Sequence, residues 1–262
     1  AAGVSGVVSA SNSLVGGSTD DQMFNVLALA NGNYAVASPH WKNVATNAAF
    51  AGAVAWGSGT AGATGLVSAA NAVVGTHSFD FVGGLGEYTP VGGGGGFNYP
   101  ITVFSLGSNS NYVISSNHWN GNLGAVTWIN GATGLALDGT MTISAASSLV
   151  GSSVGDRVSF RNLSQIALVQ NFLTLGINNP AGITVLGNGS VIVDSSLWNG
   201  ARGAVTWMNG ATGLAGTVSG SITARELVVL RSARINGDVH YDALTIEQGA
   251  EVEGRFAHRV PA

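Results

Sequence analysis

The chain has 262 residues and a net charge of −4, with 45% hydrophobic residues, 8% charged residues, 40 glycines and no cysteine. Without cysteine, thiol and zinc–thiolate chemistry are excluded, and nine basic residues are too few to follow a nucleic-acid backbone. The hydrophobic content excludes a disordered chain, and the apolar runs are too short for a membrane-spanning helix of about 18 residues or more. The abundance of Gly, Ser, Asn and Thr favours an exported β protein over a cytosolic enzyme.

The first motif of the chain, Ser-Ala followed by Leu-Val-Gly, lies at residues 9–16 and returns in similar form at 68–75 and 144–151, where Ser-x-Ala opens the motif. Its first copy has no repeat unit before it. Short strands with few charges leave unprotected edges, so we expect residues 4–15 to pair with another copy, or to close the last unit of the same copy. Deleting residues 1–16 is then expected to abolish assembly. The residues predicted to make this contact are Val4, Val7, Val8, Leu14 and Val15.

A longer repeat contains all six tryptophans. The segment Gly-Ala-Val-x-Trp occurs at residues 52–56, 124–128 and 203–207, and the last two copies continue with x-Asn-Gly-Ala-Thr-Gly. Each copy follows a Val-rich or Tyr-rich strand that leads to Trp41, Trp119 or Trp198. Strand-forming residues separated by Asn-Gly or Gly-Ser turns predict an all-β fold. We expect three propeller-like antiparallel units over residues 1–215, at about 5–65, 66–140 and 141–215.

Two segments interrupt the repeat. Residues 83–100 include five consecutive glycines and are expected to form a mobile loop. Residues 166–175 are compatible with a helix, but the neighbouring segments favour a strand.

The repeat offers few groups for catalysis. His40 and His118 each precede a strand-end Trp, but the third copy has Leu197 there, so packing beside the indole is favoured over catalysis. An enzyme would use a carboxylate pair, with Asp80 and Asp156 the first candidates. No catalytic, cofactor or metal site is predicted. Burial is also favoured for the tryptophans, and the alternative is a ligand-facing set that stacks on sugars, made of Trp41, Trp119 and Trp198.

The motifs Asn-Gly-Asn-Tyr-Ala-Val-Ala-Ser-Pro and Gly-Ala-Val over roughly residues 5–220 resemble repeats of bacterial surface adhesins of the filamentous-haemagglutinin type. They are also similar to FG-GAP blades of integrin-like propellers, in which Asp80 and Asp156 would lie in the opening turn. This second resemblance implies calcium loops, but the matching loops carry Asn and Ser in place of several Asp. Neutral amides bind calcium poorly without carboxylates, so calcium is disfavoured.

The composition changes near residue 216, where charged residues become frequent. Apolar residues then recur every 17 positions, which predicts stacked rungs of a short right-handed β-helix-like tail over residues 216–262. The recurring pairs are Leu227 and Leu244, Val229 and Ile246, Ala233 and Ala250, Ile235 and Val252, and Gly237 and Gly254. The segment Ile-Asn-Gly-Asp-Val-His-Tyr-Asp-Ala-Leu-Thr-Ile resembles bactofilins, bacterial proteins whose β-helices polymerise into filaments.

These features predict a non-enzymatic extracellular structural protein that assembles by β-strand addition between subunits into a fibre or surface filament, with adhesion as a further role. The expected partners are other copies of the chain, and glycans or a cell surface if the fibre is adhesive. The alternative is a monomeric carbohydrate-binding or adhesion module of a larger surface adhesin. The bactofilin-like tail also keeps a cytoplasmic scaffold open.

Overall fold

The computed structural model describes residues 5–23, 25–84, 89–90, 97–98, 102–161, 181–218, 221–229, 234–236, 238–253 and 255–258. Val4, most of the expected loop at 83–100 and the expected strand at 166–175 lie outside these residues. The chain divides into two compact units, Ala1–Thr217 and Val218–Ala262. We call the first unit the repeat stack and the second the tail.

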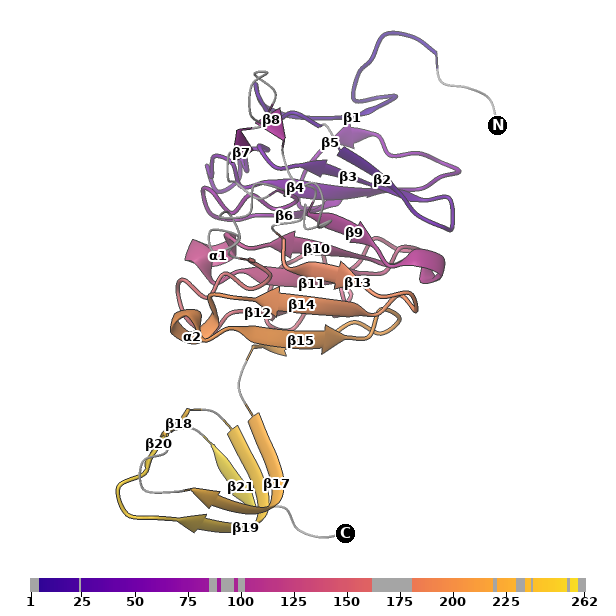
Figure 1. Ribbon diagram of the computed structural model, residues 1–262. Coiled ribbons are helices and arrows are strands. Elements are labelled where there is room, and N and C mark those ends of the chain that lie inside the picture. The colour runs from indigo at the N-terminus through magenta and orange to yellow at the C-terminus, as the bar shows by residue number, and fades with distance from the viewer. Residues whose placement is uncertain are drawn as a thin grey trace. The chain divides into compact units, whose positions relative to one another are not determined.

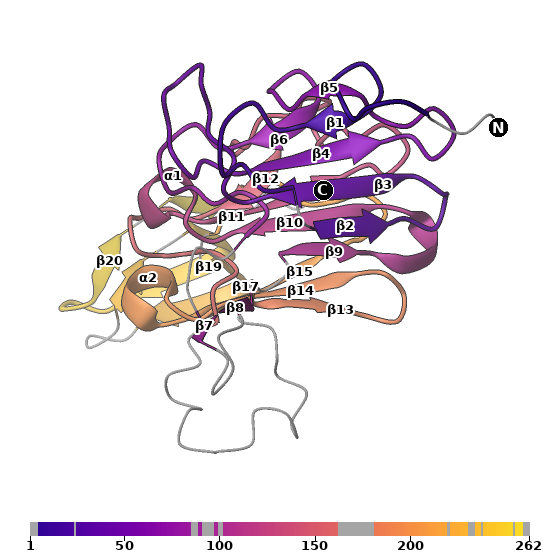
Figure 2. The ribbon, with the colours of Figure 1, turned by 90° about the horizontal axis from the view of Figure 1, so that it is seen from above.

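The predicted all-β class is confirmed, and the repeat stack contains three main antiparallel sheets, one above another (Figures 1 and 2). The first sheet has the order β2 (Asn25–Ala28), β3 (Tyr34–Ser38), β4 (Ala53–Gly57), β6 (Ala72–Val74). The second has the order β9 (Val103–Ser105), β10 (Tyr112–Ser116), β11 (Ala125–Ile129), β12 (Ser148–Val150), β16 (Gly216–Thr217). The third has the order β13 (Ile183–Val185), β14 (Val191–Ser195), β15 (Ala204–Met208).

Asn-Gly turns connect strands at corresponding places in the first and third sheets. Asn31 and Gly32 lie between β2 and β3, and Asn188 and Gly189 lie between β13 and β14. Gly32 and Gly189 have φ of 85° and 79°, a conformation that glycine adopts without steric cost. Both turns therefore close antiparallel hairpins, in agreement with the general expectation for Asn-Gly between strands.

Strands from neighbouring repeat copies also pair in parallel. β1 (Leu14–Val15) pairs with β5 (Gly65–Leu66), and β12 pairs with β16. In the second case a strand that follows the third sheet in sequence becomes the edge of the second sheet. The chain thus joins successive sheets by main-chain hydrogen bonds as well as by side-chain packing.

Apolar side chains from the first and second sheets share one core. Val54 and Val73 of the first sheet belong to the same buried cluster as Ile114 and Ile129 of the second. Alternating apolar residues place these side chains on the facing surfaces of the two sheets. Burial of that shared surface stabilises the stack.

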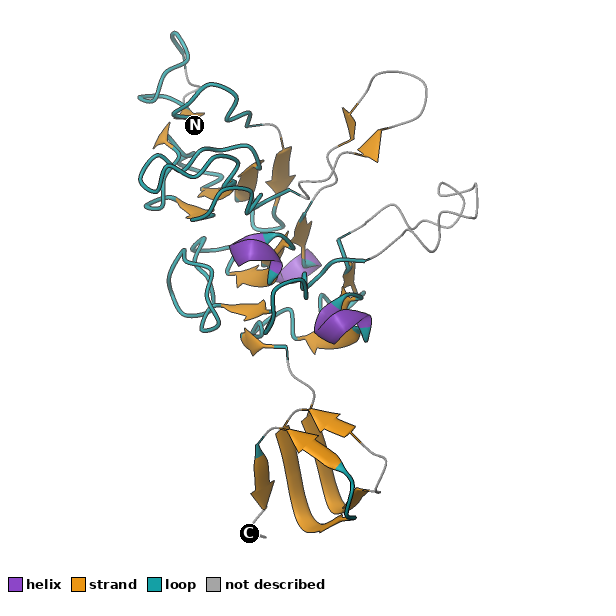
Figure 3. Cartoon of the chain, turned by 90° about the vertical axis from the view of Figure 1, so that its left-hand side faces the viewer, coloured by secondary structure: helices purple, strands orange, loops and turns teal. Residues whose placement is uncertain are grey.

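Two helices of a single turn, α1 (Trp119–Asn122) and α2 (Trp198–Ala201), follow the second strand of the second and third sheets (Figure 3). The sequence did not predict a helix at either place. Each contains Trp-Asn-Gly, and the Asn and Gly residues have positive φ, so the turn cannot continue as a regular helix. The remaining short elements are η1 (Gly107–Asn109), β7 (Thr89–Pro90) and β8 (Phe97–Asn98).

The tail consists of parallel strands. One sheet has the order β17 (Ser221–Val229), β19 (Asp238–Ile246), β21 (Phe256–His258), and a second sheet pairs β18 (Arg234–Asn236) with β20 (Glu251–Glu253). Leu227 faces Leu244, and Ile235 faces Val252. The predicted 17-residue period is therefore confirmed as the register of strand pairing.

Candidate assembly interface

Tryptophan side chains connect each sheet of the stack to the next. Trp56 on β4 donates a hydrogen bond from Nε1 to the carbonyl oxygen of Gly131, at 3.0 Å. Trp128 on β11 donates the same bond to Gly210, at 2.9 Å. The two acceptors occupy the same position of the Asn-Gly-Ala-Thr-Gly turn in successive repeat copies. The turn that follows the Gly-Ala-Val-x-Trp strand of one sheet thus accepts a hydrogen bond from the indole of the preceding sheet.

A second glycine of that turn lets the indole approach closely. A Cβ atom at Gly134 would lie 2.7 Å from Trp56, and one at Gly213 would lie 3.0 Å from Trp128. Both glycines have positive φ. We call the contact of an indole with the two glycines of the following turn the Trp–Gly contact. Any side chain at the second glycine would force the indole away.

Aspartates make the other repeated contact between copies. Oδ2 of Asp80 accepts hydrogen bonds from the N–H groups of Thr76 and His77, and Oδ1 accepts one from Asn120, which follows β10 of the next sheet. Asp156 bonds in the same way to Ser152, Ser153 and Asn199, and Asp21 to Gly17, Ser18 and Lys42. Each carboxylate is buried and holds its own turn against a loop of the sheet that comes next in the chain.

These aspartates were not recognised in the sequence as contacts between copies. The signal was a constant spacing, because Gly16, Gly75 and Gly151 each precede an aspartate by five residues. Asp80 and Asp156, the first candidates for a catalytic pair, direct both oxygens to backbone N–H groups. Within the described residues, no group of three or more His, Asp or Glu side chains is arranged to hold a metal ion.

The bonds to Asp156 also set its ionisation. Burial by itself raises the pKa of this carboxyl, but the N–H donors of Asn199, Ser153 and Ser152 and the Ser152 hydroxyl outweigh burial and leave the pKa below its ordinary value. The charged form is therefore the one that the folded stack holds.

The third sheet ends the stack with its contact residues uncovered. Val126 and Trp128 on β11 are 0% and 6% exposed, whereas the equivalent Val205 and Trp207 on β15 are 72% and 55% exposed. In the described part of the chain, β15 pairs with β14 alone. This end presents one half of the contact that joins the earlier sheets.

The other end of the stack presents the opposite half. Gly62 ends the turn after β4 with a φ of +76°, as Gly134 and Gly213 do in the later copies. A Cβ atom at Gly62 would meet nothing within 4 Å. In the described residues β1 pairs with β5 alone. The turn that receives an indole and the strand beside it are therefore both open.

The predicted assembly and ligand residues lie in different environments. Leu14 and Val15 form β1 and are half-buried, Val7 and Val8 are exposed, and Val4 lies outside the described residues. Of the tryptophans considered for sugar stacking, Trp41 is buried in the core of the first sheet, while Trp119 and Trp198 are half-buried.

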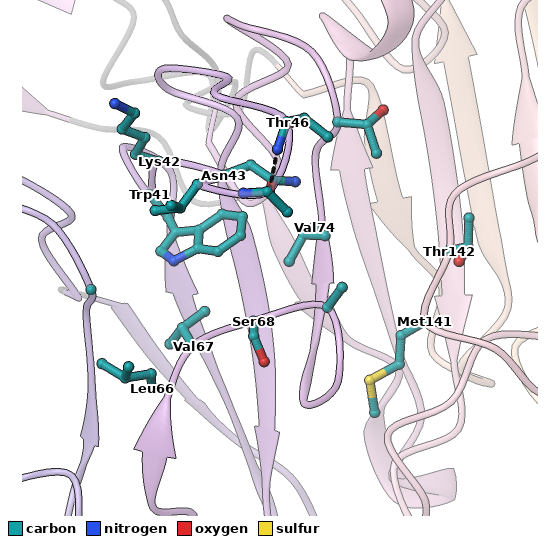
Figure 4. A pocket seen from close by; sticks show the side chains of 15 residues that line it. Trp41, Lys42, Asn43, Thr46, Leu66, Val67, Ser68, Val74, Met141 and Thr142 are labelled. Carbon is teal, nitrogen blue, oxygen red and sulfur yellow. Dashed lines mark hydrogen bonds between the residues drawn. The ribbon is translucent and has the colours of Figure 1, made fainter.

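A mostly apolar pocket of about 650 Å³ lies beside Trp41 (Figure 4). It is lined by Leu66, Val67, Val74 and Met141, and the ammonium group of Lys42 is directed away from its apolar wall. The lining contains one charged residue and no carboxylate. The lining also has no histidine, so it offers no pair of groups for general acid–base catalysis.

The histidines before the strand-end tryptophans contact other groups. The His40 ring lies edge-on to Phe50, with 5.3 Å between ring centroids, and burial lowers its pKa although Asp20 opposes this. His118 Nδ1 hydrogen-bonds to Asn122 at 2.9 Å, and Nε2 lies 2.8 Å from an Arg157 nitrogen. These contacts hold loops in place at the side of the stack.

Comparison with known families gives two matches. Residues 1–25, 28–84 and 106–160 match a family described as a repeat of unknown function, DUF5650. Residues 181–257 match the bactofilin family, described as polymer-forming cytoskeletal. No curated protein and no solved structure gives a significant match. None of the helices in the described residues has the length and apolar character needed to span a membrane.

The fold is that of a repeat protein. Its antiparallel sheets are joined by repeated contacts, and a tail of parallel strands follows them. The repeat matches cover just over half of the residues, so the chain belongs to the DUF5650 repeat family. The bactofilin match over residues 181–257 agrees with the resemblance of the tail and extends it into the third sheet. Neither match is to an adhesin or FG-GAP family, so that resemblance stays a prediction.

Proposed function

We propose that this protein is a non-enzymatic structural subunit that assembles with itself into a filament through its tail. The observation that carries the proposal is the 17-residue register of parallel strands within a polymer-forming domain. β17 and β21 lie at the two edges of the tail sheet. Unpaired strand edges add further strands readily, so the first rung of one copy can extend the last rung of another.

The family description "cytoskeletal" favours a cytoplasmic scaffold over a surface filament. Adhesion to glycans is the less favoured alternative, because Trp41 is buried and Trp119 and Trp198 are half-buried. A structural role also agrees with the use of Asp80 and Asp156 to bind backbone groups.

Electron microscopy and light scattering of the full chain test this proposal. Val239 lies in the tail core with no exposed surface, and the next residue, His240, is exposed. A charge at a buried position disrupts packing, whereas one at an exposed position does not. We expect filaments from the native chain and from His240→Asp, and their loss in Val239→Asp. Native chains that stay single at high concentration, or undiminished filaments from Val239→Asp, would show that the tail does not drive assembly.

A further inference from the structure

The third sheet is incomplete, and the strand that would complete it is present at the other end of the same sequence. We infer that β1 of a second copy pairs with β15 and adds the missing fourth strand. This contact deepens the proposed function, because it gives the self-assembling subunit a second interface, made by the repeat stack. The partner surface is the N-terminal end of another copy of this chain.

The internal sheets show what such a fourth strand looks like. β6 and β12 are fourth strands, each antiparallel to the Gly-Ala-Val-x-Trp strand of its own sheet. Both belong to the Leu-Val-Gly or Val-Val-Gly motif, as β1 does. The third sheet lacks such a strand, because the residues that follow β16 form β17, which pairs with β19 in the tail.

The register of the new pair follows from the second sheet. There, Ala125 pairs with Val150, Val126 with Leu149, and Thr127 with Ser148. Aligning the repeated motifs gives the expected pairs between copies, which are Ala204 with Val15, Val205 with Leu14, and Thr206 with Ser13. Leu14 of one copy would thus cover Val205 of the other, which is largely exposed in the single chain.

Main-chain bonding agrees with this register. Gly75 donates its N–H to the carbonyl of Gly52 at 3.0 Å, and Gly151 donates to Gly124 at 3.1 Å. The corresponding third bond would run from the N–H of Gly16 in one molecule to the carbonyl of Gly203 in the other. Joining β13, β14 and β15 to β1 and β5 also reproduces the strand order of the complete second sheet, in which a parallel strand follows the fourth strand.

The exposed tryptophan completes the contact. Trp207 corresponds to Trp56 and Trp128, and the turn that ends at Gly62 corresponds to the two turns that receive those indoles. Docking would place Trp207 over Gly62, with its Nε1 donating to the carbonyl of Gly59. Both halves of a third Trp–Gly contact therefore exist on one chain, at separate sites.

The two halves cannot meet within one copy. β1 and β15 lie at opposite ends of the repeat stack, with the first and second sheets between them (Figure 1). A contact between unlike surfaces propagates head to tail unless its rotation closes a ring. In the repeat, Gly6 and Val7 correspond to Gly216 and Thr217 of β16. Because β16 already pairs with β12, Gly6 and Val7 of the incoming molecule cannot pair there. Residues before Ser13 therefore lie outside the joined sheet, in agreement with the exposure of Val7 and Val8.

Cysteine cross-linking tests the register, and the chain has no cysteine of its own. The hydroxyls of Thr127 and Ser148 lie 2.9 Å apart in the second sheet, so Ser13→Cys with Thr206→Cys should place two thiols together. The control is Leu14→Cys with Thr206→Cys, because a shift of one residue moves the side chain to the other face. After oxidation we expect a ladder of disulfide-linked multimers from the first pair and its loss in the control.

Mixing two single variants identifies the partner. Ser13→Cys mixed with Thr206→Cys should give dimers and nothing larger, after circular dichroism has shown that both variants fold. Equal cross-linking by the control pair, a disulfide within one copy, or no cross-linking would overturn the inference. Repeating the cross-linking in chains that also carry Val239→Asp tests this contact independently of assembly through the tail. Filaments without cross-links contradict only the strand contact, and cross-links without tail-dependent filaments contradict only the tail proposal.

Discussion

Asp156 illustrates how one side chain joins two successive sheets. Its carboxylate accepts hydrogen bonds from the N–H groups of Ser152 and Ser153 in its own turn and from that of Asn199, which follows β14 of the third sheet. Hydrogen bonds to a charged group contribute about 1.5–3 kcal/mol to stability. The repeated aspartates therefore fix both the turn and the spacing of the sheets.

We predict that Asp156→Asn lowers the free energy of unfolding by about 1.5–3 kcal/mol at neutral pH, because the amide cannot replace the charged acceptor. The pKa of Asp156 is lower in the folded chain, so its contribution is present above the unfolded pKa of about 3.9 and is lost as the pH falls through the folded value. Denaturant titrations should show the native chain and the variant converging in acid. Asp138→Asn, at an exposed position, is the control. A constant difference at every pH would contradict this assignment.

The Trp–Gly contact gives a second prediction for single residues. Gly134 and Gly62 have nearly the same positive φ, but only Gly134 faces an indole. Alanine at either position adds a backbone cost of about 1–2 kcal/mol, and at Gly134 it adds overpacking of about 1–3 kcal/mol. Denaturation of the unassembled chain should therefore show Gly134→Ala to be the less stable variant. Equal losses would mean that the close approach to Trp56 contributes nothing.

At the scale of elements, the tail is an array in which each rung contacts only its neighbours. β17, β19 and β21 pair at an offset of 17 residues. The stability of such arrays is approximately a sum over rungs and their interfaces. The length of the repeat, together with its apolar pattern, therefore determines whether a further rung fits.

Duplicating residues 234–250 should add a rung and raise the hydrogen-exchange protection of the β17 and β19 amides. Duplicating residues 235–250, one residue fewer, should lower that protection, because a shift of one residue turns inward side chains outward. Mass spectrometry of the full chain after exchange measures both. Similar protection in the two variants would mean that the 17-residue register is not essential.

At the scale of the whole molecule, we propose two different means of self-association. In the first the tail extends by adding rungs, and in the second β1 of one molecule adds to β15 of another. The two differ in chemistry, since the exposed indole belongs to the stack alone. Their contributions can therefore be measured separately in one preparation.

Assembly should protect tryptophan fluorescence from a soluble quencher such as acrylamide. Trp207 is the most exposed indole, because Trp56 and Trp128 are covered by the following turns. We expect quenching to fall as the chain concentration rises, and most of that fall to disappear in Trp207→Phe. A fall that is unchanged in Trp207→Phe would locate the protected indole elsewhere.

The sequence by itself determined the all-β class, the hairpins at Asn31 and Asn188 and the 17-residue rungs of the tail. These follow from local rules, since turn chemistry and alternation act between near neighbours in the chain. The one-turn helices were not predicted, because Asn-Gly pairs with positive φ are typical of hairpin turns as well.

Only the tertiary structure decided which copy each contact joins. The indole of Trp56 and the carbonyl of Gly131 are 75 residues apart, and no local pattern shows that one donates to the other. The same holds for Asp80 and Asn120. Stacking of the sheets makes such pairs adjacent, because it brings together residues that are far apart in the chain. Among the described residues, it leaves the indole of Trp207 exposed and nothing over Gly62.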